Sequence, residues 1–273
     1  MYRGLIAALV TPLTGDGEVP EHDIARLIAS LRPYVTALLP ALSTGEGWAL
    51  SERQWLAMVG GTVRHAGGLP VLAGVMRPTT AGALERARTA ARLGAKAVVA
   101  TTPYGPGLSQ EEMYRHYASL SGGAGLPVVV YHESQVSGNR LRLDTLLRVC
   151  ALPGVAAVKD SAGDAEFTRR LVAARPGVPV LQGLESLALE PTGVEGHVLA
   201  LANAEPELCA ELCAAMAAAS PVEDTAGWKA RLGEAVERYG LARPDWYRML
   251  KTELYRRSVL TTDQVAETKE ASP

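Results

Sequence analysis

Lys159 follows four apolar residues, 155–158, and a lysine in such a setting can act as a nucleophile. Burial disfavours the ammonium ion, so it lowers the pKa of the amine. A neutral lysine can attack a ketone and form a Schiff base. The structural alternative is a lysine that reaches water along its aliphatic stem or pairs with Asp160.

Tyr131 and the loop at residues 43–46 follow two other apolar runs. A phenol near a lysine imine can move protons in acid–base catalysis, and otherwise Tyr131 anchors the end of a strand. The loop is Ser-Thr-Gly-Glu, whose hydroxyls and backbone N–H groups can bind a carboxylate. Glu46 could hold this loop or cap a helix. The case for a catalytic site is stronger for Lys159, Tyr131 and the loop together than for any one of them, because all three stand at the carboxyl ends of expected strands.

Eight short segments have the apolar pattern of parallel strands buried on both faces. Between most of them lie segments of helical periodicity, such as residues 23–31 and those that begin near Ser51, Thr79, Ser109 and Asp164. Such an alternation predicts an α/β fold, a (β/α)8 TIM barrel, whose active site lies at the carboxyl ends of the strands. The expected strands are residues 6–10, 37–42, 71–73, 97–101, 128–131, 156–159, 178–181 and 198–201.

The remaining chain is expected to be helical. We predict a barrel over residues 1–203 and a C-terminal helical extension over residues 204–273, with helices at 205–219, 224–239 and 245–255. Pro191 and Gly193 interrupt the seventh connection, so its helix should be short. A doubly wound sheet is the alternative fold. It would need a Gly-rich phosphate turn after the first strand, where only Gly15-Asp16-Gly17 is present.

Composition excludes several functional classes. The chain has 27 basic and 29 acidic residues and no long block of like charge, so binding to nucleic acid or a membrane surface is not expected. No apolar stretch approaches the ~18 residues of a membrane span. Three cysteines cannot form a disulfide framework, and neither they nor the five histidines have metal-ligand spacing. We expect a cytoplasmic protein that binds no metal.

The segments around these residues resemble the dihydrodipicolinate synthase/N-acetylneuraminate lyase family of Schiff-base aldolases. The resemblance implies that Lys159 forms the Schiff base, that Tyr131 is the proton shuttle and that residues Ser43, Thr44 and Gly45 hold the carboxylate of a 2-oxo acid. It also implies that the carbonyl of Val198 faces the substrate. No metal or organic cofactor is implied, and the expected assembly is a homotetramer or homodimer. The matching segments are residues 8–12, 43–47, 72–74, 102–104, 131 and 158–163, with weaker matches at 182–183, 196–198 and 202–203.

Departures from the family pattern concern the part of the site that receives the second substrate. Lysine-biosynthetic members have an arginine where this chain has Val136, and a second tyrosine where it has Gly105. Leu42 also replaces a usual glycine. We therefore expect poor condensation of pyruvate with aspartate semialdehyde. The residues expected to select the acceptor aldehyde are His132, Glu133, Gln135 and Glu185.

The sequence thus predicts a class I lyase or aldolase that acts on pyruvate or a related 2-oxo acid. A dehydratase that works through the same imine is a close neighbour. Within the family the alternative is 4-hydroxy-tetrahydrodipicolinate (dihydrodipicolinate) synthase itself. A non-catalytic sensor of 2-oxo acids is disfavoured, because binding a carboxylate requires neither Lys159 nor Tyr131.

Overall fold

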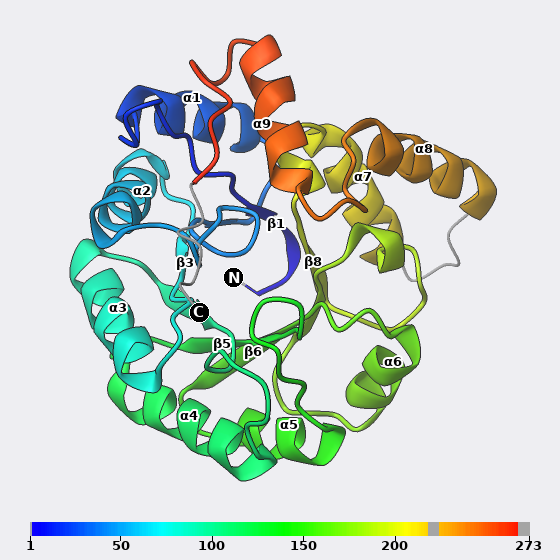
Figure 1. Cartoon of the computed structure of the whole chain (residues 1–273). Helices are drawn as coiled ribbons and strands as arrows, with labels where there is room; N and C mark the ends of the chain where they lie inside the picture. The colour runs from blue at the N-terminus through cyan, green and yellow to red at the C-terminus, as the bar shows by residue number, and fades with distance from the viewer. Residues whose placement is uncertain (1, 218–223, 267–273) are drawn as a thin grey trace.

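The computed structural model describes residues 2–217 and 224–266, and within them eight parallel strands form a nearly closed barrel (Figure 1). The hydrogen-bonded order is β2-β1-β8-β7-β6-β5-β4-β3. The two ends of this sheet meet at a single bridge between Leu38 and Val71, and Gly74 N donates to Pro40 O at 2.9 Å. The TIM barrel prediction is confirmed. The strands are β1 (Gly4–Ala8), β2 (Ala37–Leu39), β3 (Leu72–Gly74), β4 (Ala97–Ala100), β5 (Val128–His132), β6 (Val155–Asp160), β7 (Val180–Gln182) and β8 (Gly196–Leu199).

Helices connect the strands on the outside of the ring. Four of them begin where the sequence predicts, because the side chains of Ser51, Thr79, Ser109 and Asp164 each accept a hydrogen bond from the backbone N–H three residues later. The seventh connection is only a short 3-10 helix, η1 (Glu185–Leu187), as expected. The helices are α1 (Glu21–Leu31), α2 (Glu52–His65), α3 (Thr80–Leu93), α4 (Gln110–Gly123), α5 (Leu143–Cys150), which was not predicted, and α6 (Ala165–Ala173).

Side chains of each strand alternate between the barrel interior and the shell of helices. Val129 and Ala157 belong to the interior core, whereas Val128, Val130 and Val158 pack in the core beneath the helices. Tyr131 also belongs to the interior core, two residues after Val129. By the same alternation Lys159, two residues after Ala157, points into the barrel near its carboxyl end.

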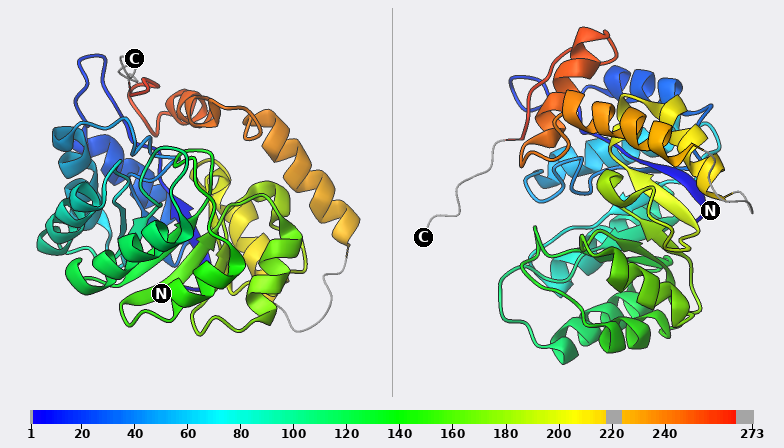
Figure 2. Two further views of the ribbon diagram at one scale, coloured as in Figure 1. Left: turned by 60° about the horizontal axis from the view of Figure 1, so that its bottom comes forward. Right: turned by 90° about the vertical axis from the view of Figure 1, so that its right-hand side faces the viewer.

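The C-terminal part consists of η2 (Leu201–Asn203), α7 (Pro206–Ala217), α8 (Thr225–Arg238) and α9 (Trp246–Arg256). Helix α7 packs against β1 and β8 and so completes the ring of helices, while α8 and α9 lie outside it (Figures 1 and 2). The division at residue 203 stays a prediction, and the packing of α7 favours an extension that starts later. Residues 218 and 219 of the helix expected at 205–219 lie outside the described residues. None of the helices in the described ranges is both long and apolar enough to span a bilayer.

Candidate active site

Strands β5 and β6 place Tyr131 and Lys159 side by side. The two residues are register partners, and Lys159 Nζ lies 3.7 Å from the centroid of the Tyr131 ring. Lys159 is 4% exposed, so its amine does not extend into solvent. Asp160 binds other groups, since its Oδ2 accepts from Thr168 Oγ1 at 2.7 Å. The alternative roles of Lys159, a snorkelling side chain or a partner of Asp160, are therefore wrong.

The loop after β2 reaches the same point from the other side. Ser43 Oγ and Tyr131 OH are hydrogen-bonded at 2.9 Å and both residues are buried. Gly45 instead faces β1: Thr11 Oγ1 donates to its carbonyl at 2.7 Å, and a Cβ there would lie 2.8 Å from Leu9 O. Glycine thus lets the loop pack against β1. Ser43 and Thr44 line the site as expected, whereas Gly45 supports the loop from behind.

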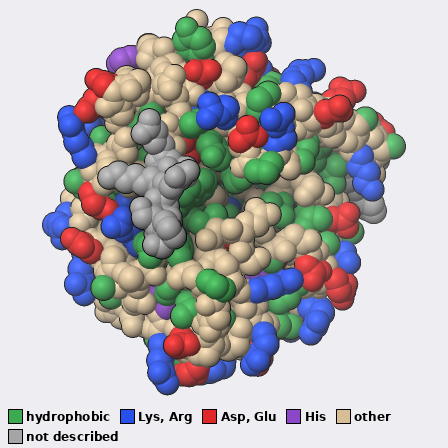
Figure 3. All heavy atoms as spheres, in the orientation of Figure 1, with side chains coloured by type: hydrophobic (Ala, Val, Ile, Leu, Met, Phe, Trp, Pro, Cys, Tyr) green, Lys and Arg blue, Asp and Glu red, His purple; other side chains and the backbone are tan. Residues whose placement is uncertain are grey.

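These side chains surround a cavity of about 430 Å³ at the carboxyl end of the barrel. Figure 3 looks onto this end, where hydrophobic side chains surround a hollow near the centre. A volume of this size suits a small organic ligand. The barrel contributes a wall that includes Ser43, Thr44, Tyr131, Lys159, Ser161 and Val198.

Two carboxylates, Glu133 and Glu185, line the cavity, and both also accept hydrogen bonds from backbone N–H groups. Glu133 accepts from Val136 N at 2.8 Å and from Ser137 N at 3.2 Å. Glu185 Oε1 accepts from Ala200 N at 2.7 Å and from Leu201 N at 2.9 Å. Burial raises the pKa of Glu185, and these N–H groups partly offset that effect. Both acids and the exposed Gln135 thus line the cavity, and their role in selecting the acceptor stays a prediction.

His132 is not in the cavity, which corrects the expectation for this residue. It follows Tyr131 on β5, so alternation turns its side chain toward the helices. Its Nδ1 lies 3.0 Å from Asp160 Oδ1, and its ring is 4.7 Å from that of Phe167. His132 therefore belongs to the packing between β5, β6 and α6.

Gly183 is a site residue that the sequence marks only as part of a weak match. A Cβ at this position would lie 2.8 Å from Lys159 Cε and 2.2 Å from Ser161 Oγ. The absence of a side chain therefore makes room for the lysine.

The chain segment between α8 and α9 supplies a further wall that sequence reasoning missed. It contributes an arginine, Arg243, whose Nε donates to Asp245 Oδ1 at 3.1 Å. No local pattern could reveal this wall, since it lies far along the chain from the other site residues. Its lining residues are Leu241, Ala242, Arg243 and Pro244, and Trp246, the first residue of α9, lines the cavity next to them.

Within the described residues, no group of three or more His, Cys, Asp or Glu side chains is arranged to hold a metal ion. A second cavity of about 630 Å³ lies beside the loop that follows residue 47, and it contains neither Lys159 nor Tyr131. Lys159 and Tyr131, to which the sequence assigns the chemistry, thus line the smaller cavity.

Comparisons with known proteins give one consistent family. The model of the dihydrodipicolinate synthetase family matches residues 1–264. The 4-hydroxy-tetrahydrodipicolinate synthase of Sphingopyxis alaskensis is 35% identical over 223 residues, which are 80% of this chain and 76% of the relative. That of Thermomicrobium roseum is 34% identical over 217 residues, 78% of this chain and 72% of the relative.

Solved structures are similar over nearly the whole chain. Dihydrodipicolinate synthase from Bacteroides thetaiotaomicron has a TM-score of 0.86 at 29% identity and covers 97% of this chain and 92% of its own. The enzyme from Acinetobacter baumannii, solved with pyruvate, has a TM-score of 0.87 at 24% identity and covers 100% and 94%. At 24% identity, the similarity to the Acinetobacter baumannii structure shows a shared fold only.

Proposed function

The chain belongs to the dihydrodipicolinate synthetase family, whose members are class I aldolases and lyases, and we propose that it makes or breaks a carbon–carbon bond of a 2-oxo acid through an imine on Lys159. The observation that carries this proposal is the chain of contacts in the cavity. Lys159 Nζ lies 3.7 Å from the Tyr131 ring centroid, and Tyr131 OH lies 2.9 Å from Ser43 Oγ. These contacts hold the amine that we assign as the nucleophile next to the phenol that we assign as the proton carrier, at the carboxyl end of the barrel.

In the cleavage direction, the free amine of Lys159 attacks the C2 ketone and water leaves to form an iminium. Removal of the proton from the 4-hydroxyl breaks the C3–C4 bond, and the aldehyde departs. The electron pair of that bond moves into the iminium and gives an enamine. Protonation at C3 and hydrolysis then release pyruvate and regenerate the amine. Tyr131 OH is the group placed to move these protons, with Ser43 orienting it.

Ser43 and Thr44, which line the cavity, are the residues we assign to the carboxylate of the 2-oxo acid, and we assign the carbonyl of Val198, another lining residue, to face the substrate. Hydroxyl and backbone donors suit a carboxylate because each can donate a hydrogen bond to it. The iminium itself is the electron sink, so no step passes through a metal or an organic cofactor.

The acceptor end of the cavity is where this chain departs from lysine-biosynthetic relatives. Val136 brings no charge to the lining, whereas Arg243 brings a guanidinium from the segment between α8 and α9. We propose that Arg243 selects the aldehyde together with Glu133, Gln135 and Glu185. A monoanionic carboxylate suits this set better than a dianionic phosphate, because Asp245 and the two glutamates would repel the second charge.

Borohydride trapping tests the Schiff base. The protein is incubated with pyruvate or another 2-oxo acid, reduced, and measured by mass spectrometry. We expect one adduct, located on Lys159, and none on the exposed Lys229, which is the internal control. An adduct on another lysine, or no adduct with any 2-oxo acid of the panel, contradicts the proposal.

The second candidate is 4-hydroxy-tetrahydrodipicolinate synthase, which the names of the relatives favour. Val136 and Gly105 disfavour it, because they replace the carboxylate-binding arginine and the second tyrosine. We expect a coupled assay with pyruvate and aspartate semialdehyde to show poor condensation. A kcat/KM of about 10⁴–10⁸ M⁻¹s⁻¹, the ordinary enzyme range, would make this synthase the better description.

We also propose that the protein works in the cytoplasm as a homotetramer or homodimer. The compartment is inferred from the composition and cysteine usage of the sequence, and the assembly from the family resemblance. Sedimentation analysis of the purified chain measures the assembly, and a monomer at all concentrations would contradict it.

A further inference from the structure

A buried ion pair joins helix α9 to the loop that carries Ser43 and Thr44. Lys251 on α9 pairs with Glu46, and their side chains are 0% and 1% exposed. Lys251 Nζ also donates to Gln264 O at 2.7 Å, and Ala266 N donates to Glu46 Oε2. The helix, the segment after it and the loop therefore meet at one carboxylate.

Such a pair is a poor device for stability alone. Removing two charges from water costs free energy that their attraction only partly returns. Burial accordingly lowers the pKa of Lys251, and the nearby Glu46 carboxylate opposes this shift. What a buried pair provides is a definite geometry, since either charge is strongly unfavourable without the other.

Glu46 transmits that geometry directly to the carboxylate-binding loop. Its backbone N–H donates to Ser43 O at 3.0 Å, and Gly47 N donates to Leu42 O at 2.9 Å. Glu46 has a φ of 56°, in the left-handed region that a non-glycine residue seldom adopts. A side chain anchored on Lys251 offsets the cost of that conformation.

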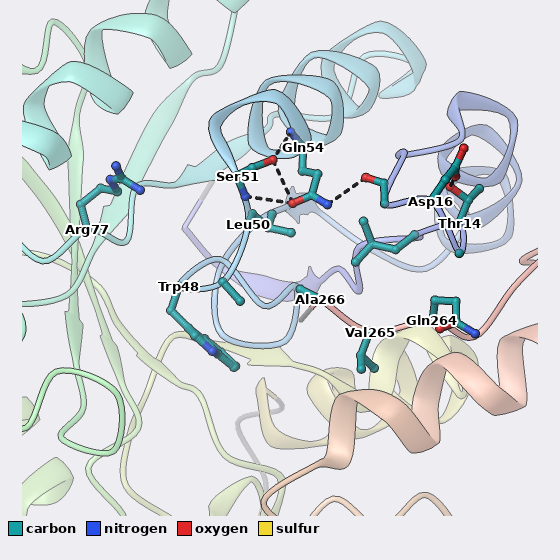
Figure 4. Close-up of a pocket in the computed structure, with 14 residues that line it drawn as sticks. Thr14, Asp16, Trp48, Leu50, Ser51, Gln54, Arg77, Gln264, Val265 and Ala266 are labelled. Atoms are coloured by element: carbon teal, nitrogen blue, oxygen red, sulfur yellow. Dashed lines mark hydrogen bonds between the residues drawn. The ribbon is translucent and has the colours of Figure 1, made fainter. Parts of the chain in front are cut away.

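The loop is held from two sides. Arg86 on α3, 2% exposed, donates to Gly47 O and to Leu50 O, each at 3.2 Å. On the other side, residues 264–266, which follow α9, lie near residues 48–51, which follow the loop. Figure 4 shows Gln264, Val265 and Ala266 around the cavity of about 630 Å³ that Trp48, Leu50 and Ser51 also line. Two buried cations, Arg86 of α3 and Lys251 of α9, thus bind the loop from different sides.

We propose that Lys251 is a positioning residue for the 2-oxo acid. Through Glu46 it holds Ser43 and Thr44 in the conformation that receives the carboxylate. This inference rests on the proposed function, in which that loop binds the carboxylate. Lys251 touches no reacting atom in this scheme, so its loss weakens substrate binding more than it slows the chemistry of bound substrate.

The experiment compares Lys251→Met, Glu46→Gln and the double variant with the wild-type protein. Lys229→Met, an exposed lysine on α8, is the matched control. Pyruvate affinity is measured from the concentration dependence of borohydride trapping. Chemistry is measured as deuterium exchange into the pyruvate methyl group at saturating pyruvate, which requires the imine and its enamine but no aldehyde.

Either single variant should weaken pyruvate binding by about tenfold or more, because it removes the contact between Lys251 and Glu46 that holds the loop. The exchange rate at saturation should change much less. The double variant, which lacks the same contact, should bind pyruvate about as weakly as the singles, so that the two losses do not add, and Lys229→Met should match the wild-type protein. If Lys251→Met does not fold, Glu46→Gln alone gives the comparison, since it preserves size and the acceptor for Ala266 N.

A single variant that binds pyruvate like the wild-type protein, with only a lower melting temperature, would overturn the inference. So would a double variant that binds pyruvate like the wild-type protein, because the losses in the singles would then come from an unpaired buried charge and not from the missing contact. Failure of the wild-type protein to trap any 2-oxo acid would refute the proposed function instead, so the two failures are distinguishable.

Discussion

Gly183→Ala tests whether Lys159 occupies the position that makes it the nucleophile. The new methyl carbon would lie 2.8 Å from Lys159 Cε, 3.1 Å from Lys159 Cγ and 2.2 Å from Ser161 Oγ. Ser161 can relieve its contact by rotating about χ1. Lys159 has less freedom, because the Tyr131 ring lies 3.7 Å from its amine on another side.

The size of the effect follows from these contacts. Overpacking a well-filled site costs about 1–3 kcal/mol. A reacting group that is displaced by about 1 Å loses on the order of 10²-fold in rate. We therefore expect imine formation on Lys159 to slow by roughly 10²-fold, while the melting temperature falls by about 2–12 °C, at about 2–4 °C per kcal/mol for a chain of this size.

The assay is the rate of adduct formation with pyruvate and borohydride, with deuterium exchange into the pyruvate methyl group as a second readout. Gly122→Ala is the matched control, since Gly122 is exposed on α4 and a Cβ there meets nothing within 4 Å. It should retain full activity and change stability by less than about 1 kcal/mol. Imine formation at the wild-type rate in Gly183→Ala would refute the placement of Lys159.

Three further expectations follow. Tyr131→Phe should lower turnover by roughly 10²–10⁴-fold with little change in pyruvate affinity, and turnover near the wild-type value would remove the phenol from the mechanism. Arg243→Ala should lower kcat/KM about tenfold or more for condensation of pyruvate with succinic semialdehyde but not with butanal, and an equal loss for both aldehydes would contradict a carboxylate contact. Burial lowers the pKa of His116 to about 4, so the unfolded chain, titrating near 6.5, binds more protons between these values. Stability should thus decline by up to roughly 3 kcal/mol as pH falls from about 6.5 to about 4; calorimetry of His116→Asn, which should lack this slope, checks the assignment.

Local patterns were sufficient to predict most of the fold. Consecutive apolar residues indicate strands buried on both faces, and Ser51, Thr79, Ser109 and Asp164 mark helix starts because each cap is a contact within one turn of chain. Once eight strands alternate with helices, barrel topology requires their carboxyl ends to meet. For this reason Lys159, Tyr131 and the loop at 43–46 could be assigned to one site from the sequence.

The side of the strand to which a residue's side chain points is harder to predict than the residues that form the strand. His132 follows Tyr131 immediately, and both were expected in the site. Only one of two successive residues can face the interior of a barrel, and the packing of Val129 inside decides that it is Tyr131.

Contacts between distant segments were decided by tertiary structure alone. Arg243 reaches the cavity, and Lys251 reaches Glu46, only because α8 and α9 fold back over the barrel. In the sequence Arg243 lies between two expected helices and Lys251 within one, and no spacing relates either residue to the loop at 43–46. Gly183 likewise matters through the volume that Lys159 occupies beside it. Periodicity and capping report interactions within a few residues, whereas burial of a charge and exclusion of a methyl group depend on which atoms the whole fold brings together.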